Sequence, residues 1–376
     1  MQQTTYRDTT LSDYFKKMSV GSFIFIGDVY DSLVITNYSA TGYQNYGVVN
    51  SEVINKIKNR VNWNRYDNWT RTTAFQFSNT PDGEVDLVII IYRSKPNILW
   101  FSGIAELGFD AIQVSPTKQV RGWFPNIYGN SGGGITLPNG VEYTLSGQKG
   151  IVPYLAHEFG HFLFDGGHTR SSIYTEGYGL MGGTFSPCMN ADERRRLGWL
   201  SIPDLPSGQT TISDYMTTNA AYKIPISADE YFLIENHQKI SIYDGAGYFN
   251  NHPSPDPFGK GLYIFHMYNV NSNYPSEIYY TTKCADGRFN LTLVCQPTNP
   301  YNSNGTVRIW QRNYPNPKFG YDEIEAYNNF LEGSPCTNLT SAYYTGDGAG
   351  DKEDAFNIGY NQIFSPYSNP GTHSWD

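Results

Sequence analysis

The stretch that decides the fold of this chain is His157-Glu158-Phe159-Gly160-His161-Phe162-Leu163-Phe164-Asp165-Gly166-Gly167-His168. Its first five residues have the pattern H-E-x-x-H, and residues i and i+4 of a helix project from the same face. His157 and His161 can therefore offer two imidazole nitrogens to one zinc ion. Glu158 lies where a carboxylate can reach a metal-bound water, so this pattern is typical of zinc hydrolases with a glutamate as general base.

A catalytic zinc site needs a third protein ligand, and the residues after the motif offer one. Residues 162–164 extend the helix, and Gly166-Gly167 then ends it, because glycine tolerates positive φ. This turn would bring His168 back towards the metal, so we expect His157, His161 and His168 to bind zinc. The five-residue pattern alone also occurs by chance in ordinary surface helices; the glycine pair and the further histidine favour a metal site.

The motif helix is expected to begin near Gly150. Pro153 suits a first helical turn, where its missing N–H is not required. Ile151, Val152 and Leu155 provide an apolar stripe that would bury the helix against the core.

Composition narrows the class of protein. The chain has 376 residues, 39% of them hydrophobic and only 16% charged, with 37 glycines, 21 prolines and 31 tyrosines. This is typical of a loop-rich, β-containing protein of the extracellular kind. The net charge is -9 without any basic run, which argues against a nucleic-acid partner. No apolar stretch reaches the length of a membrane span, and the longest, residues 87–92, predicts a strand buried on both faces of a sheet.

The four cysteines have no C-x-x-C spacing, which argues against a cysteine zinc site. An even number in this composition favours disulfides, pairing Cys284 with Cys295 across a hairpin and Cys188 with Cys336. Four buried thiols are the alternative.

The first residues, 1–5, lack the charged start and apolar core of a signal peptide. We nevertheless expect a secreted protein, of which this chain is a processed piece or a fragment.

The remaining pattern predicts an α+β fold in two subdomains of one catalytic unit. Residues 1–168 are expected to form an N-terminal α/β subdomain that ends in the zinc motif, and residues 169–376 a β-rich C-terminal subdomain. The amphipathic helix at 50–61 has Asn50 or Ser51 as its cap. The other expected elements are helices at 10–18 and 190–200, strands at 21–27, 32–36, 84–92, 231–235 and 261–266, and a hairpin at 135–145 around Asn139-Gly140.

Residues 346–354 place three aspartates and a glutamate on a glycine-rich loop. Hard cations bind several oxygens from such loops, so this is a candidate structural calcium site. The loop lacks the EF-hand spacing, and a solvated acidic turn explains it equally well.

Taken in order, these segments resemble the catalytic domain of the immune inhibitor A-type secreted zinc metallopeptidases, a branch of the metzincins. The resemblance covers most of the chain. It includes, besides the H-E-x-x-H helix, Leu11-Ser-Asp-Tyr-Phe, Asp82-Gly-Glu-Val-Asp-Leu-Val, Gly179-Leu-Met-Gly-Gly, Met189-Asn-Ala, Leu197-Gly-Trp-Leu, Tyr231-Phe-Leu-Ile-Glu-Asn-His-Gln, Gly346-Asp, Asp354-Ala-Phe and Tyr367-Ser-Asn-Pro.

The resemblance implies a metzincin-like fold with a substrate cleft, and a Met-turn at Met181 that forms an apolar floor under the zinc. Met189 is the weaker rival for that role. The sequence departs from the family where His168 lies eleven residues after His157 rather than ten, and where Phe164 replaces a glycine. Acidic residues are common here in the family, which makes Asp165 a rival ligand; we prefer His168, because neutral imidazole is a good zinc donor.

The expected function is that of a zinc endopeptidase acting on protein or peptide substrates, in which Glu158 takes a proton from water and passes it to the leaving amine. One alternative is a catalytically inactive extracellular surface or adhesion module that retains the fold. Another is a zinc hydrolase of non-peptide amides. His237, His252 and His266 are expected to be structural or exposed.

Overall fold

The structure is a computed structural model. It describes residues 10–39, 41–73, 76–92, 103–123, 125–130, 134–136, 142–144, 148–164, 166, 179–181, 188–244, 259–273, 278–283, 285, 288–295, 306–313, 342–344, 355–368 and 372.

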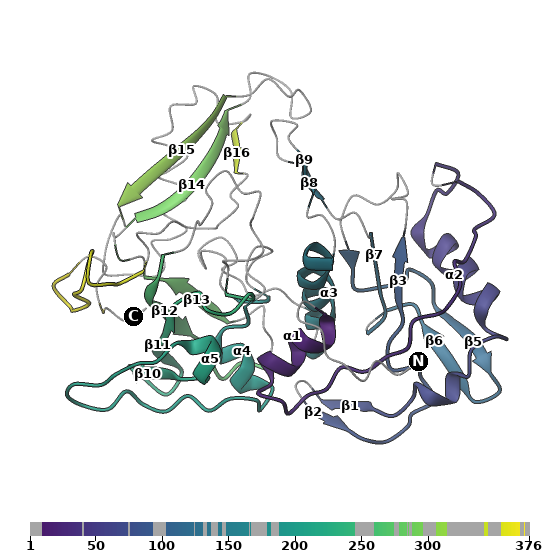
Figure 1. The fold of residues 1–376 in the computed structure, drawn as a ribbon, viewed down its shortest axis with the longest axis horizontal. Coiled ribbons are helices and arrows are strands. Elements are labelled where there is room, and N and C mark those ends of the chain that lie inside the picture. Colours follow the sequence, from purple (N-terminus) through teal and green to yellow (C-terminus); the bar gives the residue numbers. More distant parts are fainter. Residues whose placement is uncertain are drawn as a thin grey trace. The chain divides into compact units, whose positions relative to one another are not determined.

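The chain forms two compact units of mixed α/β structure with small sheets (Figure 1). Unit 1 comprises Met1–Ile135 and Thr144–Gly167, and unit 2 comprises Thr136–Tyr143 and His168–Asp376. The metzincin-like arrangement and the single catalytic unit stay predictions.

Unit 1 contains the motif helix and a mixed sheet of order β3-β7-β4. In that sheet β3 runs parallel to β7, while β4 is antiparallel to it. The elements are α1 (Leu11–Met18), α2 (Tyr46–Ile57), the 3-10 turn η1 (Trp63–Arg65), β1 (Thr70–Thr73), β2 (Gln76–Ser78), β3 (Ile89–Tyr92), β4 (Gly103–Ile104), β5 (Ala111–Ser115), β6 (Lys118–Arg121), β7 (Ile127–Asn130) and α3 (Gln148–Leu163). The other described strands before α3 form three two-stranded sheets. These are β1-β2, β5-β6, and β8 (Gly134–Thr136) with β9 (Glu142–Thr144).

Helix α3 packs against β7, β4 and α1. Its side of the core is aromatic: the ring of Phe159 lies 5.3 Å from both Phe15 and Phe25 and 6.2 Å from Phe23, measured between centroids. Such ring pairs add to the stabilisation that burial provides, by about 0.5–1.5 kcal/mol each. These aromatic contacts therefore anchor the helix that bears the motif.

The predicted helix at 10–18 is confirmed as α1, whose N-cap Thr10 accepts the N–H of Asp13. The predicted helix at 50–61 is also present, but it starts at Tyr46 with Asn45 as cap, so the proposed caps Asn50 and Ser51 are wrong. Asn50 is instead fully buried inside the helix.

The predicted strands at 21–27 and 32–36 are wrong, because these residues form no strand. The N–H of Phe23 donates to the hydroxyl of Ser19, and that hydroxyl lies within hydrogen-bond distance of the Phe23 carbonyl. The hydroxyl of Ser12 donates to the carbonyl of Phe25. Side chains thus satisfy groups that a neighbouring strand would otherwise bind.

The predicted strand at 84–92 is shortened to β3, and it is not buried on both faces, because Ile91 is half exposed. The hairpin at 135–145 is confirmed by the pairing of β8 with β9, while its turn lies outside the described residues. Helix α3 begins two residues earlier than expected, at Gln148, so Pro153 lies beyond the first turn.

Unit 2 is built on an antiparallel sheet of order β10-β11-β12-β13. Its described elements are α4 (Ala191–Arg196), α5 (Tyr215–Thr218), β10 (Ala221–Pro225), β11 (Glu230–His237), β12 (Gly261–Tyr268), β13 (Tyr279–Thr282), β14 (Arg288–Cys295), β15 (Thr306–Asn313) and β16 (Ala342–Tyr344). The strands predicted at 231–235 and 261–266 are confirmed as β11 and β12, and the helix predicted at 190–200 as the shorter α4.

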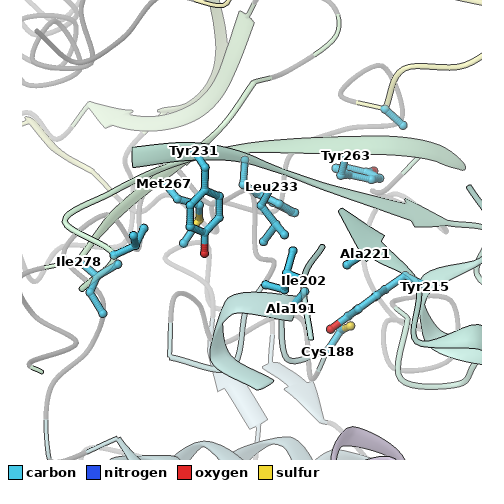
Figure 2. Close-up of a cluster of buried hydrophobic side chains, with 13 residues drawn as sticks. Cys188, Ala191, Ile202, Tyr215, Ala221, Tyr231, Leu233, Tyr263, Met267 and Ile278 are labelled. Carbon is cyan, nitrogen blue, oxygen red and sulfur yellow. The ribbon is translucent and has the colours of Figure 1, made fainter. Parts of the chain in front are cut away.

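A buried apolar cluster joins this sheet to α4 and α5. Figure 2 shows Tyr231 and Leu233 pointing from β11 towards Ala191 and Ile202, with Tyr215 and Cys188 at one end. Burial of apolar side chains stabilises a folded protein by about 25 cal/mol for each Å² of apolar surface removed from water. The cluster therefore holds α4 in place.

Candidate metal centre

Helix α3 holds the first two candidate zinc ligands on one face. The imidazole rings of His157 and His161 lie 4.9 Å apart between centroids and cross at 85°. His157 is buried and His161 is partly buried. This confirms the spacing argument at the level of geometry, because two rings so close can direct one nitrogen each to a single ion.

The turn after α3 orients His161. Its Nδ1 lies 3.0 Å from the carbonyl oxygen of Gly166, a contact in which the ring N–H donates to the carbonyl. Metal-binding histidines commonly donate the other ring N–H to such an acceptor, which fixes the tautomer and leaves the Nε2 lone pair for the ion. The residue types and the Nδ1 contact of His161 therefore match those of histidines that bind zinc.

The expected glycine break is present. The N–H of Gly166 donates to the carbonyl of His161 at 2.7 Å, and Gly166 has a φ of 102°, a conformation that favours glycine. The candidate third ligands His168 and Asp165 both lie outside the described residues, so the third donor stays a prediction.

Glu158 has the properties of a proton carrier. Burial raises the pKa of its carboxyl from 4.5 to about 7, and the nearby backbone of Ala105 partly opposes this rise. Its Oε2 lies 3.9 Å from Nε2 of His161. A carboxyl with a pKa near neutrality can both accept and return a proton at physiological pH.

In unit 2, Met181 lies in a fully buried turn. The N–H groups of Leu180 and Met181 each donate to the carboxylate of Glu193 at 2.8 Å, and the N–H of Asn190 donates to the same group at 3.0 Å. Burial raises the pKa of Glu193 to about 7. Met189, the rival to Met181, is also fully buried, so burial does not separate the two.

Sequence reasoning missed Glu193, although a signal was present. Asn190-x-x-Glu193 is a capping box at the start of α4. In it the Asn190 side chain accepts a hydrogen bond from the N–H of Glu193, and the Glu193 carboxylate accepts one from the N–H of Asn190. That pattern predicts a helix start. It does not reveal that the same carboxylate also accepts hydrogen bonds from a turn twelve and thirteen residues earlier in the chain.

A second group of potential ligands, also missed, lies in unit 2. Cys188, His237 and Asp244 bring ligand atoms within 4.8 Å of one another. However, His237 Nδ1 lies 2.5 Å from Asp244 Oδ1 and Nε2 lies 2.9 Å from Glu235 Oε2. The two carboxylates raise the pKa of His237 to about 10 against the opposing effect of burial.

An imidazolium that donates from both nitrogens has no lone pair for a metal. Burial raises the pKa of the Cys188 thiol, which opposes formation of the thiolate that metals bind. The charges of this group therefore compensate one another without an ion, and the residues do not fit a metal site.

The predictions for the remaining histidines, the cysteines and the acidic loop are tested only in part. His237 and His266 are fully buried and bonded to carboxylates, as structural histidines are, while His252 lies outside the described residues. The thiol of Cys188 lies 3.2 Å from Sδ of Met216. Cys188 is a buried thiol that forms no disulfide, so the predicted pairing with Cys336 is wrong. Cys284 of the other predicted disulfide and the acidic loop at 346–354 lie outside the described residues, so the Cys284–Cys295 disulfide and the calcium site stay predictions.

Comparison with known proteins adds no family. No protein-family model matches the chain, and neither a curated protein nor a solved structure is significantly similar to it. In the described part of the chain, none of the helices has the length and apolar character needed to cross a membrane.

Proposed function

We propose that this protein is a secreted zinc-dependent endopeptidase that hydrolyses peptide bonds in protein or peptide substrates. The observation that carries the proposal is the pairing of His157 and His161 on one helical face with a partly buried glutamate whose pKa is about 7. A structural histidine pair has no need of such a carboxyl beside it. The resemblance to the immune inhibitor A-type metallopeptidases supports the same reaction.

His157 and His161 would hold the ion, with His168 as the proposed third ligand and Asp165 as its rival. Zinc, when bound, polarises a substrate carbonyl and acidifies water at neutral pH. Glu158 acts as general base towards the attacking water and then as general acid towards the leaving amine. Its pKa suits both steps, because neither protonation state is strongly disfavoured near pH 7.

The proposed substrate is an extended peptide. In the described part of the sheet, β4 is an edge strand, paired with β7 on one side. Edge strands bind extended peptides through backbone hydrogen bonds. The strand is followed directly by Ala105, whose backbone is near enough to Glu158 to oppose the rise of its pKa, so a peptide along this edge would pass close to the general base.

The test is the Glu158→Gln variant, which removes the proton carrier while leaving both histidines. We expect casein or gelatin digestion to fall by at least roughly 10²-fold, with zinc content unchanged. Glu52→Gln in α2 is the matched control, because Glu52 pairs with Lys56 away from α3, and it should retain activity.

Chelator should abolish digestion by the wild-type protein, and added zinc should restore it. Normal turnover by Glu158→Gln would contradict the assigned role. A wild-type protein that binds zinc but cleaves only small amides would favour the non-peptide hydrolase, and one inactive on every substrate would favour the adhesion module.

A further inference from the structure

The stretch at residues 22–27, which follows α1, has one edge whose backbone groups are already bonded. The N–H of Phe23 donates to the hydroxyl of Ser19 at 2.9 Å, and that hydroxyl lies 3.1 Å from the Phe23 carbonyl. The carbonyl of Phe25 accepts a hydrogen bond from the hydroxyl of Ser12. Ser12 belongs to α1 and Ser19 is its C-cap. Side chains from the α1 region therefore occupy the edge to which Phe23 and Phe25 direct their backbone groups.

The opposite edge of the same stretch is open. Successive residues of an extended chain direct their N–H and C=O groups to opposite edges, so Ile24 and Ile26 face away from the two serines. In the part of the chain that the structure describes, neither isoleucine has a hydrogen bond at its N–H or its carbonyl. The donors and acceptors along this edge thus have the spacing at which an antiparallel strand binds.

The side chains of the stretch alternate in the same way. The rings of Phe23 and Phe25 lie 5.7 and 5.6 Å from the ring of Phe15, measured between centroids. Ile24 and Ile26 point to solvent and are 49% and 71% exposed. Edge strands are commonly protected by charged residues or proline, but residues 20–27 contain neither. An apolar edge of this kind is a site for pairing with another strand.

The charges at the two ends of the stretch indicate which strand fits. Lys16 and Lys17, both exposed, are the nearest charged residues before it, and Asp28 and Asp31 are the nearest after it. In an antiparallel pair of two identical strands, the lysine end of each copy lies opposite the aspartate end of the other. A second copy of this chain therefore complements the stretch in charge as well as in hydrogen bonds, and the pairing closes with twofold symmetry.

We propose that residues 22–27 pair antiparallel with the same residues of a second copy, so that the protein forms a twofold-symmetric dimer. The register places Ile24 of each copy opposite Ile26 of the other, and each such pair exchanges two hydrogen bonds between N–H and carbonyl groups. The isoleucine side chains of both copies then lie on one face as cross-strand neighbours. This interface does not depend on the proposed peptidase activity.

The test is analytical ultracentrifugation of the purified chain between about 1 and about 500 µM, where the dimer should form in proportion to concentration. Ile26→Lys places a charge on the open edge and should weaken dimerisation at least about tenfold. Ile240→Lys is the matched control, because Ile240 is 67% exposed but lies in unit 2, and this variant should dimerise like wild type. Amide hydrogen exchange at Ile24 and Ile26 should slow as the dimer forms.

An exchange of charges tests the antiparallel register. Lys16→Asp and Asp31→Lys should each weaken the dimer about fivefold, because each places like charges opposite one another. A chain that carries both substitutions restores opposite charges at each end and should regain the strength of wild type. A double variant that is weaker than either single variant would contradict the register.

A chain that stays monomeric throughout this range overturns the inference, as does a dimer that Ile26→Lys leaves unchanged. Slow amide exchange at Ile24 and Ile26 in a monomer would show that another part of the same polypeptide covers the edge, which overturns it as well. The measurements use neither zinc nor substrate, so failure of the proposed function leaves their outcome unaffected.

Discussion

The two histidine sites of this protein have the same residue types but opposite electrostatics. In unit 1, the Nδ1 of His161 is bonded to the carbonyl of Gly166, which carries no formal charge. In unit 2, His237 lies between Glu235 and Asp244, and the two carboxylates keep it protonated. The first arrangement is the one that zinc-binding histidines commonly have, whereas the second makes the histidine a cation.

The comparison teaches that ligand-type residues in proximity do not make a metal centre. The Cys188, His237 and Asp244 group satisfies a distance criterion, yet its histidine is an imidazolium whose partners are already paired. What surrounds a histidine decides its chemistry: a neutral acceptor orients it as a ligand, and anions convert it into a cation.

The largest expected effect comes from removing the buried cation. His237→Ala leaves the carboxylates of Glu235 and Asp244 buried without their common partner, which should lower the free energy of unfolding by about 3–5 kcal/mol. Denaturant unfolding of the metal-free protein measures this. His161→Ala is the matched variant: in the same metal-free assay it should cost no more than about 1 kcal/mol, because it is partly exposed.

Substitutions at the two histidines should affect zinc content in the order opposite to their effect on stability. His161→Ala should lose stoichiometric zinc, and His237→Arg, which keeps a positive charge between the carboxylates, should retain it. Zinc lost equally from both variants would remove the distinction between the two sites.

The next effect is a loss of stability at alkaline pH. The pKa of His237 is raised from 6.5 to about 10 in the folded protein. Its contribution is fully present below pH 6.5, declines as pH rises beyond that value, and is gone above about pH 10. Linkage gives a slope on the order of 1.4 kcal/mol per pH unit within this window.

Unfolding free energies between pH 7 and 10 measure this slope. His237→Arg should flatten it, because arginine stays charged throughout. The same slope in wild type and His237→Arg would show that another group is responsible.

The smallest expected effect concerns the turn at Met181. Glu193→Gln replaces one acceptor oxygen by an NH₂ group that faces backbone N–H donors. It should lower stability by about 1–3 kcal/mol and accelerate amide exchange at Leu180 and Met181. Glu52→Gln again serves as the control, and unchanged exchange at both amides would refute the role of Glu193.

Local sequence signals predicted several elements well. The helices predicted at 10–18 and 190–200 are present, and Thr10 and Asn190 cap them, as the hydrogen-bonding side chains of these residue types allow. Asn50 carries the same signal, but the cap is Asn45, since burial against Leu107 and Tyr92 gives Asn50 a different set of partners. A residue's type restricts its hydrogen bonds; its neighbours in space choose among them.

The strands expected at 21–27 and 32–36 failed for a related reason. Alternating apolar residues such as Phe23 and Phe25 are typical of a strand, yet a strand requires a neighbour along the sheet. Here their rings pack on Phe15 and Phe159 without any such partner. Pattern predicts which side of a segment is buried, and pairing depends on the rest of the fold.

Sequence alone determined that two imidazoles and one carboxyl share a turn of helix, because the helical repeat places residues i and i+4 together whatever surrounds them. Only the tertiary structure decided the surroundings that set the pKa values of Glu158 and His237 and the orientation of His161. Burial of Glu158, the carbonyl beside His161 and the two carboxylates around His237 all come from distant or turn segments. Spacing along a helix is a local property, whereas the free energy of a charge depends on every group that replaces water around it.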